Sequence, residues 1–243
     1  MRRLSVIVGT WLCASKRTAL LGLCVLASLW GAISFQLRFE NVTARQSATQ
    51  NASNLARAFE ESVIRWIRET DSTLIFLRNS YERGSEPDEW YKSALQIIHL
   101  SDLTLQFSII GSNGLLKDST IGPRPPPQTD LNDREHFKVT AGFQRDELFI
   151  SKPLIGRVSN KWSIQLARQL HRRDGVFAGV MVASLDPTHL ANFYKSIDIG
   201  EGAITLIGLD GVVRAQAGRY APALGSSAGE TPLFQLYQNA PTG

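Results

Sequence analysis

The hydrophobic pattern of this chain begins with a long uncharged segment near the N-terminus. Apolar residues dominate from Thr18 to Leu37, and the basic segment Met1–Arg17 precedes them. A helix of about 20 apolar residues spans the hydrocarbon layer of a bilayer. We therefore expect a single transmembrane helix over 18–37. Positive charge stays on the cytoplasmic side, so residues 1–17 are expected in the cytoplasm and the bulk of the chain in the periplasm.

A cleaved secretory signal peptide is the alternative to an inner-membrane anchor. Such peptides have an apolar core of about 7–15 residues followed by small residues at the cleavage site. Here the apolar run is longer, and its end at Trp30–Ile33 does not supply that pattern of small residues. The sequence therefore favours an uncleaved anchor, and both interpretations export the rest of the chain.

A helical pattern follows the apolar segment. Residues at steps of three and four form one stripe, which comprises Leu55, Phe59, Val63, Trp66 or Ile67, Thr70, Leu74, Leu77 and Tyr81. Charged residues fill the opposite face, so the pattern predicts one long amphipathic helix over 38–82. A second, shorter helix is expected after Ser85, a potential N-cap followed by acidic residues. Its inward residues are expected to be Trp90, Ala94, Ile97 and Ile98.

Beyond this second helix the pattern becomes that of strands and turns. The expected strands are Leu103–Ile110, Leu115–Thr120, Glu147–Ser151, Trp162–Leu170, Val176–Leu185, Ala203–Gly208 and Val212–Gln216. Turns rich in glycine, such as Gly111–Gly114, join several of them. Short helices are expected near Asp133–Ala141 and from Pro187 to about Lys195. This order predicts an α+β fold with a central antiparallel sheet.

Charge and cysteine content restrict the function. Four of the 26 basic residues precede Thr18, which leaves 22 basic residues against 22 acidic residues in the rest of the chain. Nucleic-acid binding requires a basic surface on the folded domain, so we exclude nucleic acid as a partner. Both cysteines, Cys13 and Cys24, lie in or before the apolar segment. The exported part therefore has neither a disulfide framework nor a thiolate metal site.

The ordered set of elements resembles the double Cache sensor region of bacterial chemoreceptors, histidine kinases and diguanylate cyclases. The resemblance is carried by the membrane helix, the hairpin at Gly111–Gly114, the segment Asp133–Phe137, the strand pair before Asp186-Pro187, and the later segment Ile204–Arg214. It implies a membrane-distal module over 83–199 and the start of a membrane-proximal module over 200–243. The second module is expected to be incomplete, because such a unit needs about 80–100 residues.

The resemblance also implies a ligand site between the sheet and the loop and helix that cover it. Arg134 matches an arginine that can hold a carboxylate bidentately, Phe137 matches an aromatic wall, and Asp186 matches a partner for an amine. His136 and Thr129 stand where the amino-acid-binding subclass has a tryptophan and a tyrosine. The implied ligand is therefore a small molecule of the organic acid, amino acid or amine class.

Each of these residues also has a structural interpretation. Arg134 can pair with Asp130 or Asp133, Asp186 can cap the helix that begins at Pro187, and His136 and Phe137 can be core residues. The sequence leaves these alternatives open. We place Arg134, His136, Phe137 and Asp186 in the candidate ligand site.

No catalytic or metal-binding constellation is expected. The segment Gly225–Gly229 matches Gly-x-Ser-x-Gly, but no histidine or aspartate follows it, so a hydrolase triad in that order is absent. The four histidines lack the spacing of a zinc site, and no phosphate-binding loop occurs. We expect neither an enzyme nor a cofactor.

The sequence favours the sensory part of a membrane-anchored signal-transduction receptor whose output domain lies outside this chain. The resemblance implies that its long helix can form a homodimer. A membrane-tethered scaffold that binds a partner without a small ligand is the alternative. An intact apolar pocket with Arg134 pointing inward favours the sensor. Arg134 and Asp186 facing solvent, with a filled core, favour the scaffold.

Overall fold

The computed structural model describes residues 2–84, 88–100, 104–189, 202–219 and 222–239, with side chains from residue 22 onward apart from Leu100. The chain divides into two compact units, Met1–Glu60 and Glu61–Gly243. The boundaries expected between the modules remain predictions. The expected helix cap at Ser85 lies outside the described residues.

The first unit consists of one helix. Helix α1 runs without interruption over Arg2–Arg83, so it begins earlier than the apolar segment and continues into the second unit. Within the described residues, one helical stretch is long and apolar enough to cross a membrane. Its large side chains are exposed from Leu23 to Val42, as a lipid-facing helix requires.

The second unit is built on an antiparallel sheet in the order β2-β1-β6-β5-β3, with β4 paired to β5. Its strands are β1 (Thr104–Gly111), β2 (Leu116–Ser119), β3 (Phe149–Ile150), β4 (Leu154–Ile155), β5 (Trp162–His171) and β6 (Phe177–Leu185). The two-residue strand β4 was not predicted, because so short a segment has no periodicity to detect. Gly114, at a φ of 73°, closes the predicted β1–β2 turn.

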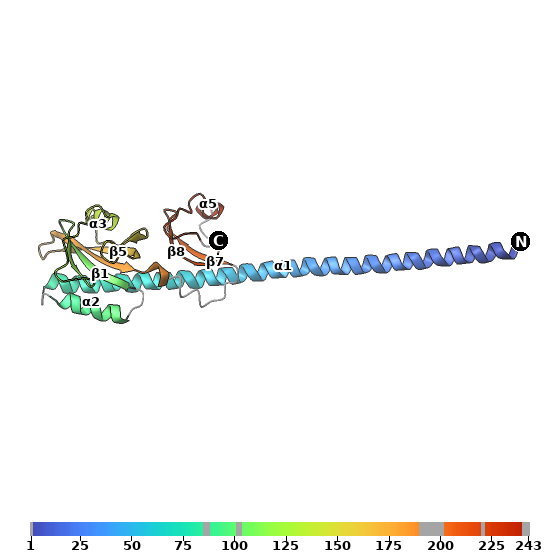
Figure 1. Ribbon diagram of the computed structural model, residues 1–243, viewed down its shortest axis with the longest axis horizontal. Helices are drawn as coiled ribbons and strands as arrows, with labels where there is room; N and C mark the ends of the chain where they lie inside the picture. The colour runs from blue at the N-terminus through green and yellow to red at the C-terminus, as the bar shows by residue number, and fades with distance from the viewer. Residues whose placement is uncertain (1, 85–87, 101–103, 190–201, 220–221, 240–243) are drawn as a thin grey trace. The chain divides into compact units, whose positions relative to one another are not determined.

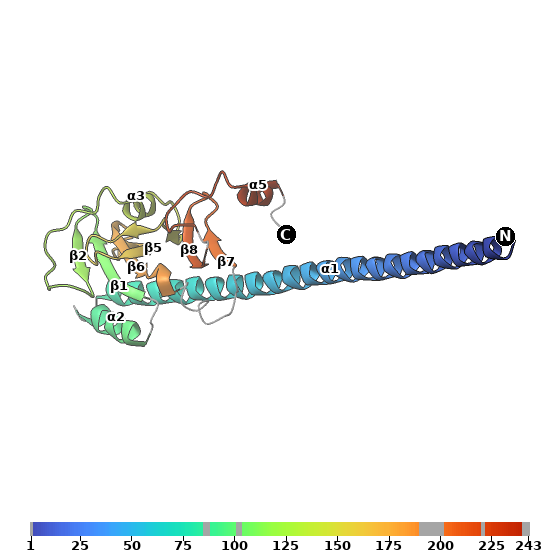
Figure 2. The same ribbon diagram turned by 45° about the vertical axis from the view of Figure 1, so that its right-hand side comes forward.

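Helices cover both faces of this sheet. The C-terminal part of α1 and helix α2 (Glu89–Leu100) lie on one face, and helix α3 (Glu135–Ala141) lies on the other (Figures 1 and 2). The predicted stripe of α1 is confirmed, because Val63, Thr70, Leu74 and Leu77 are buried. Trp90 and Ala94 of α2 are buried as expected.

The remaining elements follow β6. A helix begins at Pro187 as expected, and its continuation to Lys195 lies outside the described residues. A second sheet pairs β7 (Ala203–Ile207) with β8 (Val213–Gly218), which confirms the predicted hairpin. Helix α5 (Pro232–Asn239) was not predicted. Its eight residues bury only Phe234, so the apolar pattern is too short to identify it.

Candidate functional site

The face of the sheet that α3 covers carries a row of polar side chains. Gln106 of β1 lies opposite Ser184 of β6, and Ser184 lies opposite Gln165 of β5. All three residues are buried. Buried polar groups cost free energy unless they are hydrogen-bonded, so a polar row in the centre of a sheet needs partners.

Hydrogen bonds satisfy most of this row. Ser184 Oγ donates to Gln165 Oε1 at 2.7 Å, and Gln165 Nε2 donates to Ser163 Oγ at 2.7 Å. Gln106 Nε2 donates to Ser108 Oγ at 2.7 Å. Within the described part of the chain, Gln106 Oε1 is buried without a partner. One acceptor of the sheet is therefore available to a group from outside the described residues.

His136 of α3 contributes a second buried group. Its side chain is 5% exposed, and among the described residues its Nδ1 atom has no hydrogen-bond partner. Burial, reinforced by the charge of Arg134, lowers the pKa of His136 to about 4. The imidazole is therefore neutral at physiological pH. A neutral imidazole has one nitrogen that donates and one that accepts.

Arg134 and Arg157 lie at the edge of this region. Arg157 forms a two-point ion pair with Asp133, at 2.5 Å from Nη1 to Oδ1 and 2.7 Å from Nη2 to Oδ2. Asp133 therefore pairs with Arg157 rather than with Arg134. Arg134 Nη2 donates to the carbonyl of Ile155 at 3.3 Å, and burial together with the charge of Arg157 lowers the Arg134 pKa.

These side chains enclose a cavity of about 30 Å³ between α3, the β4 segment and the sheet. The lining comprises Gln106, Ser108, Ile110, Leu131, Arg134, His136, Leu154, Gly156, Arg157, Val158, Gln165, Val182 and Ser184. A volume of this size accommodates about one water molecule. The cavity is partly open to solvent and leaves little room around its polar groups.

The structure brings two of the four predicted site residues together. Arg134 and His136 both line the cavity. Phe137 is buried in the apolar cluster of Ile110 and its neighbours and is not among the lining residues. Asp186 Oδ1 accepts from Thr188 N at 2.8 Å, which makes Asp186 the cap of the helix at Pro187. Ligand contact by any of the four residues remains a prediction.

The sequence reasoning missed most of the polar lining. Gln106 and Ser108 occupy alternate positions of β1, and Ser163 and Gln165 occupy alternate positions of β5. Alternate strand residues share one face of a sheet. The signal that could have located the site was therefore the repeat of polar residues at alternate positions of β1 and β5. These strands are buried on both faces, where apolar residues are otherwise expected.

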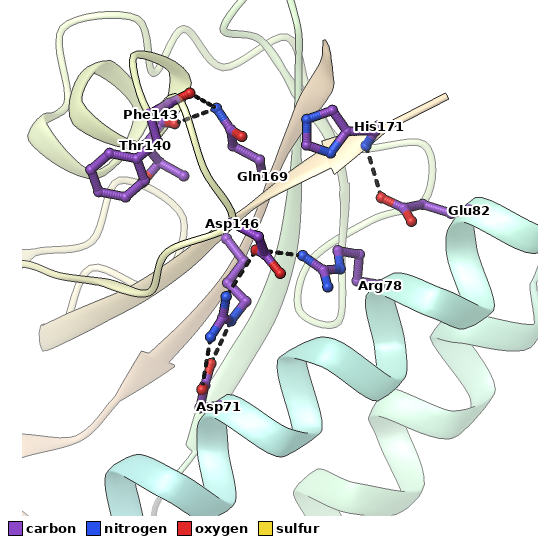
Figure 3. A network of polar contacts seen from close by, with 9 residues as sticks. Asp71, Arg78, Glu82, Thr140, Phe143, Asp146, Gln169 and His171 are labelled. Atoms are coloured by element: carbon purple, nitrogen blue, oxygen red, sulfur yellow. Dashed lines mark hydrogen bonds and ion pairs between the residues drawn. The ribbon is translucent and has the colours of Figure 1, made fainter. Parts of the chain in front are cut away.

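Strand β5 also connects the α3 side of the sheet to helix α1. Gln169 Nε2 donates to the carbonyls of Thr140 at 2.9 Å and Phe143 at 3.0 Å, at the C-terminal end of α3 (Figure 3). The adjacent Arg168 points to the opposite face and donates to Asp71 of α1 at 2.5 Å and 2.9 Å.

The loop after α3 joins the same network. Asp146 Oδ1 accepts from Arg168 Nη1 at 2.8 Å and from Arg78 Nη1 of α1 at 2.7 Å (Figure 3). The hydrogen bond from Arg78 and the one from Arg168 lower the pKa of Asp146. These bonds join the loop after α3, strand β5 and helix α1 in one charged cluster.

A larger hollow of about 740 Å³ lies at the other end of the sheet. It is lined by the end of α1, by Trp90 of α2 and by the β5–β6 turn at Arg172 and Arg173. None of the buried polar atoms without a partner in the described residues belongs to this lining. The small cavity under α3 is therefore the better candidate for a specific ligand site.

No protein-family model matches this chain. No curated protein matches it either.

Solved structures of sensor domains share its fold. The extracellular domain of rpHK1S-Z16, a proposed histidine kinase, has a TM-score of 0.67 at 25% identity, over 75% of each chain. The ligand-binding domain of the Pseudomonas fluorescens chemoreceptor CtaA, in complex with L-serine, has a TM-score of 0.60 at 16% identity, over 76% of this chain and 78% of that one. The Campylobacter jejuni chemoreceptor Tlp3, in complex with 4-methylisoleucine, has a TM-score of 0.58 at 14% identity, over 80% of this chain and 78% of that one.

The fold is that of an extracellular sensor domain. The likeness confirms the α+β fold class and the predicted resemblance to Cache-type sensors. These neighbours are sensor domains rather than catalytic ones.

Proposed function

We propose that this chain is the extracytoplasmic, small-ligand-sensing part of a membrane-anchored receptor. The observation that carries the proposal is the cavity under α3, where Gln106 Oε1 and His136 Nδ1 are buried without partners in the described structure. Groups of this kind are usually satisfied by a ligand or by an ordered water. The CtaA and Tlp3 domains, with L-serine and 4-methylisoleucine bound, support a small-molecule ligand.

The membrane helix and the basic N-terminal segment support the proposed topology. Helix α1 carries an exposed apolar surface from Leu23 to Val42, and Arg2, Arg3, Lys16 and Arg17 precede it. Basic residues at one end of an apolar helix favour the cytoplasmic side for that end. We therefore place 1–17 in the cytoplasm and the second unit outside the inner membrane. Dimerisation through α1 is part of the same proposal.

Ligand binding requires the cavity to widen. A volume of about 30 Å³ is too small for an amino acid or an organic acid, so α3 or the β4 segment moves outward when the ligand binds. Because Gln169 holds the end of α3 and Arg168 holds α1, this movement alters the contacts between the sheet and α1. A ligand shifts such an equilibrium by its difference in affinity for the two states.

A thermal-shift screen of the full chain in detergent micelles tests the proposal. The panel contains amino acids, organic acids, amines and purines. A ligand present at 100 times its Kd stabilises the folded protein by about 2.7 kcal/mol. We expect at least one ligand to raise the melting temperature and the substitution Arg134→Ala to abolish the shift. A cooperatively melting protein with no shift across the panel contradicts the sensor and favours the tethered scaffold.

A further inference from the structure

The residues that line the cavity under α3 also indicate the chemical class of its ligand. We propose that it selects a carboxylate bearing a neutral hydrogen-bond donor, such as a hydroxy acid, over the α-amino acid of the same shape. This inference rests on the proposed sensing function. It distinguishes the chain from CtaA and Tlp3, whose domains are described in complex with amino acids.

The first argument is the charge of the lining. Among the described residues that enclose the cavity, Arg134 and Arg157 are cationic and none is acidic. The charge of Arg157 is met by Asp133 at the edge, whereas Arg134 donates to a neutral carbonyl. A guanidinium without a carboxylate partner is suited to hold a carboxylate in two-point geometry. The ligand is therefore expected to be an anion.

The second argument concerns the part of the ligand that reaches the sheet. The acceptor available there is Gln106 Oε1, a neutral amide oxygen, whereas Gln165 Oε1 already accepts from Ser184. An ammonium group that leaves water needs a carboxylate to offset its desolvation. A hydroxyl group loses much less hydration free energy and needs only one acceptor. The sheet therefore matches a hydroxyl better than an ammonium.

The unpartnered His136 Nδ1 favours the same group. When His136 carries its proton on Nδ1, a hydroxyl can accept from that N–H and donate its single proton to Gln106 Oε1. An ammonium group only donates. In the Nδ1–H tautomer of His136, a hydroxy acid can therefore satisfy both buried atoms, whereas an ammonium cannot accept from Nδ1–H.

The electrostatic field at His136 agrees with this selection. The charge of Arg134 lowers the pKa of His136 more than the charge of Asp133 raises it. The charges around the cavity thus oppose the addition of a positive charge at the imidazole. The same positive charge disfavours a ligand ammonium beside His136.

Matched ligand pairs test the inference directly. Isothermal titration of the full chain in detergent micelles compares L-lactate with L-alanine and L-malate with L-aspartate, which differ in a hydroxyl against an ammonium. We expect the preferred hydroxy acid to bind at least about tenfold more tightly than its amino-acid partner. Equal or tighter binding of the amino acid overturns the inference and leaves the sensing function intact. Failure of every ligand in both this panel and the thermal screen overturns the sensing function itself.

A charge swap gives a second test. The substitution Gln106→Glu places a carboxylate where the ligand donor is expected, so it should shift the affinity ratio at least about tenfold toward the amino acid. Gln144→Glu, on an exposed loop outside the cavity, is the matched control and should leave the ratio unchanged. If Gln106→Glu does not melt cooperatively, Ser108→Asp introduces the charge at another lining position. A folded variant with an unchanged ratio overturns the inference.

Discussion

Arg168 of β5 and Asp71 of α1 form a two-point ion pair, with 2.5 Å between Nε and Oδ1 and 2.9 Å between Nη2 and Oδ2. The next residue of the strand, Gln169, faces the opposite side of the sheet and holds the end of α3. Consecutive strand residues point to opposite faces, so this dipeptide contacts both helical layers. The pair is therefore placed to couple movement of α3 to α1.

Removing the charge of Asp71 should destabilise the second unit. Arg168 is 9% exposed, and a buried donor that loses a charged partner retains much of its desolvation cost. We expect Asp71→Asn to lower the free energy of unfolding by about 1–3 kcal/mol. Urea denaturation followed by tryptophan fluorescence measures the change. Lys152→Gln is the control because its 3.8 Å contact with Asp210 is exposed, and it should cost less than about 0.5 kcal/mol. Equal effects of the two variants would show that the buried Arg168–Asp71 pair stabilises the protein no more than an exposed ion pair does.

His136 should make stability depend on pH. Its pKa is about 4 in the folded protein against 6.5 for an ordinary histidine, so the unfolded chain binds a proton that the folded chain does not. The stability associated with neutral His136 is therefore complete above about pH 6.5 and decreases as the pH falls toward 4. The full effect is on the order of 3 kcal/mol.

Chemical denaturation of the wild type and of His136→Gln between pH 4 and 7 measures this dependence. The variant should show a flatter profile over that range. His99 lies on the exposed face of α2, so His99→Gln should keep the wild-type profile. A wild-type slope that persists in His136→Gln would assign the pH dependence to other groups.

Gln169 should determine how firmly α3 is held. Gln169→Leu removes the donor to the Thr140 and Phe143 carbonyls. The Thr140 carbonyl keeps the hydrogen bond from Phe143 N, so we expect a loss of about 0.5–1.5 kcal/mol. We expect faster backbone hydrogen exchange in α3, read by mass spectrometry, together with lower stability. Gln144→Leu is the control because the 3.4 Å bond from Gln144 to Gly142 is exposed. Unchanged exchange in α3 would contradict the role of Gln169 as its anchor.

Several elements could be predicted from the sequence because their signals are local. The stripe of α1 from Val63 to Leu77 follows from helical spacing, and the β1–β2 hairpin follows from alternation and Gly114. Asp186 and Pro187 likewise mark a helix start through a cap that spans only three residues. Elements of this kind need no knowledge of distant contacts.

By itself, the sequence determined the membrane-spanning pattern, the order of the longer helices and strands, and the choice of Arg134 and His136 as candidate site residues. Only the tertiary structure decided that Asp133 pairs with Arg157, 24 residues away, and thereby leaves Arg134 without a carboxylate partner among the described residues. The pairing of Gln106 with Ser184 could not be predicted from the sequence either, since it depends on the register between β1 and β6. Periodicity is a property of neighbours along the chain, whereas the chemistry of a cavity depends on which distant side chains folding brings together.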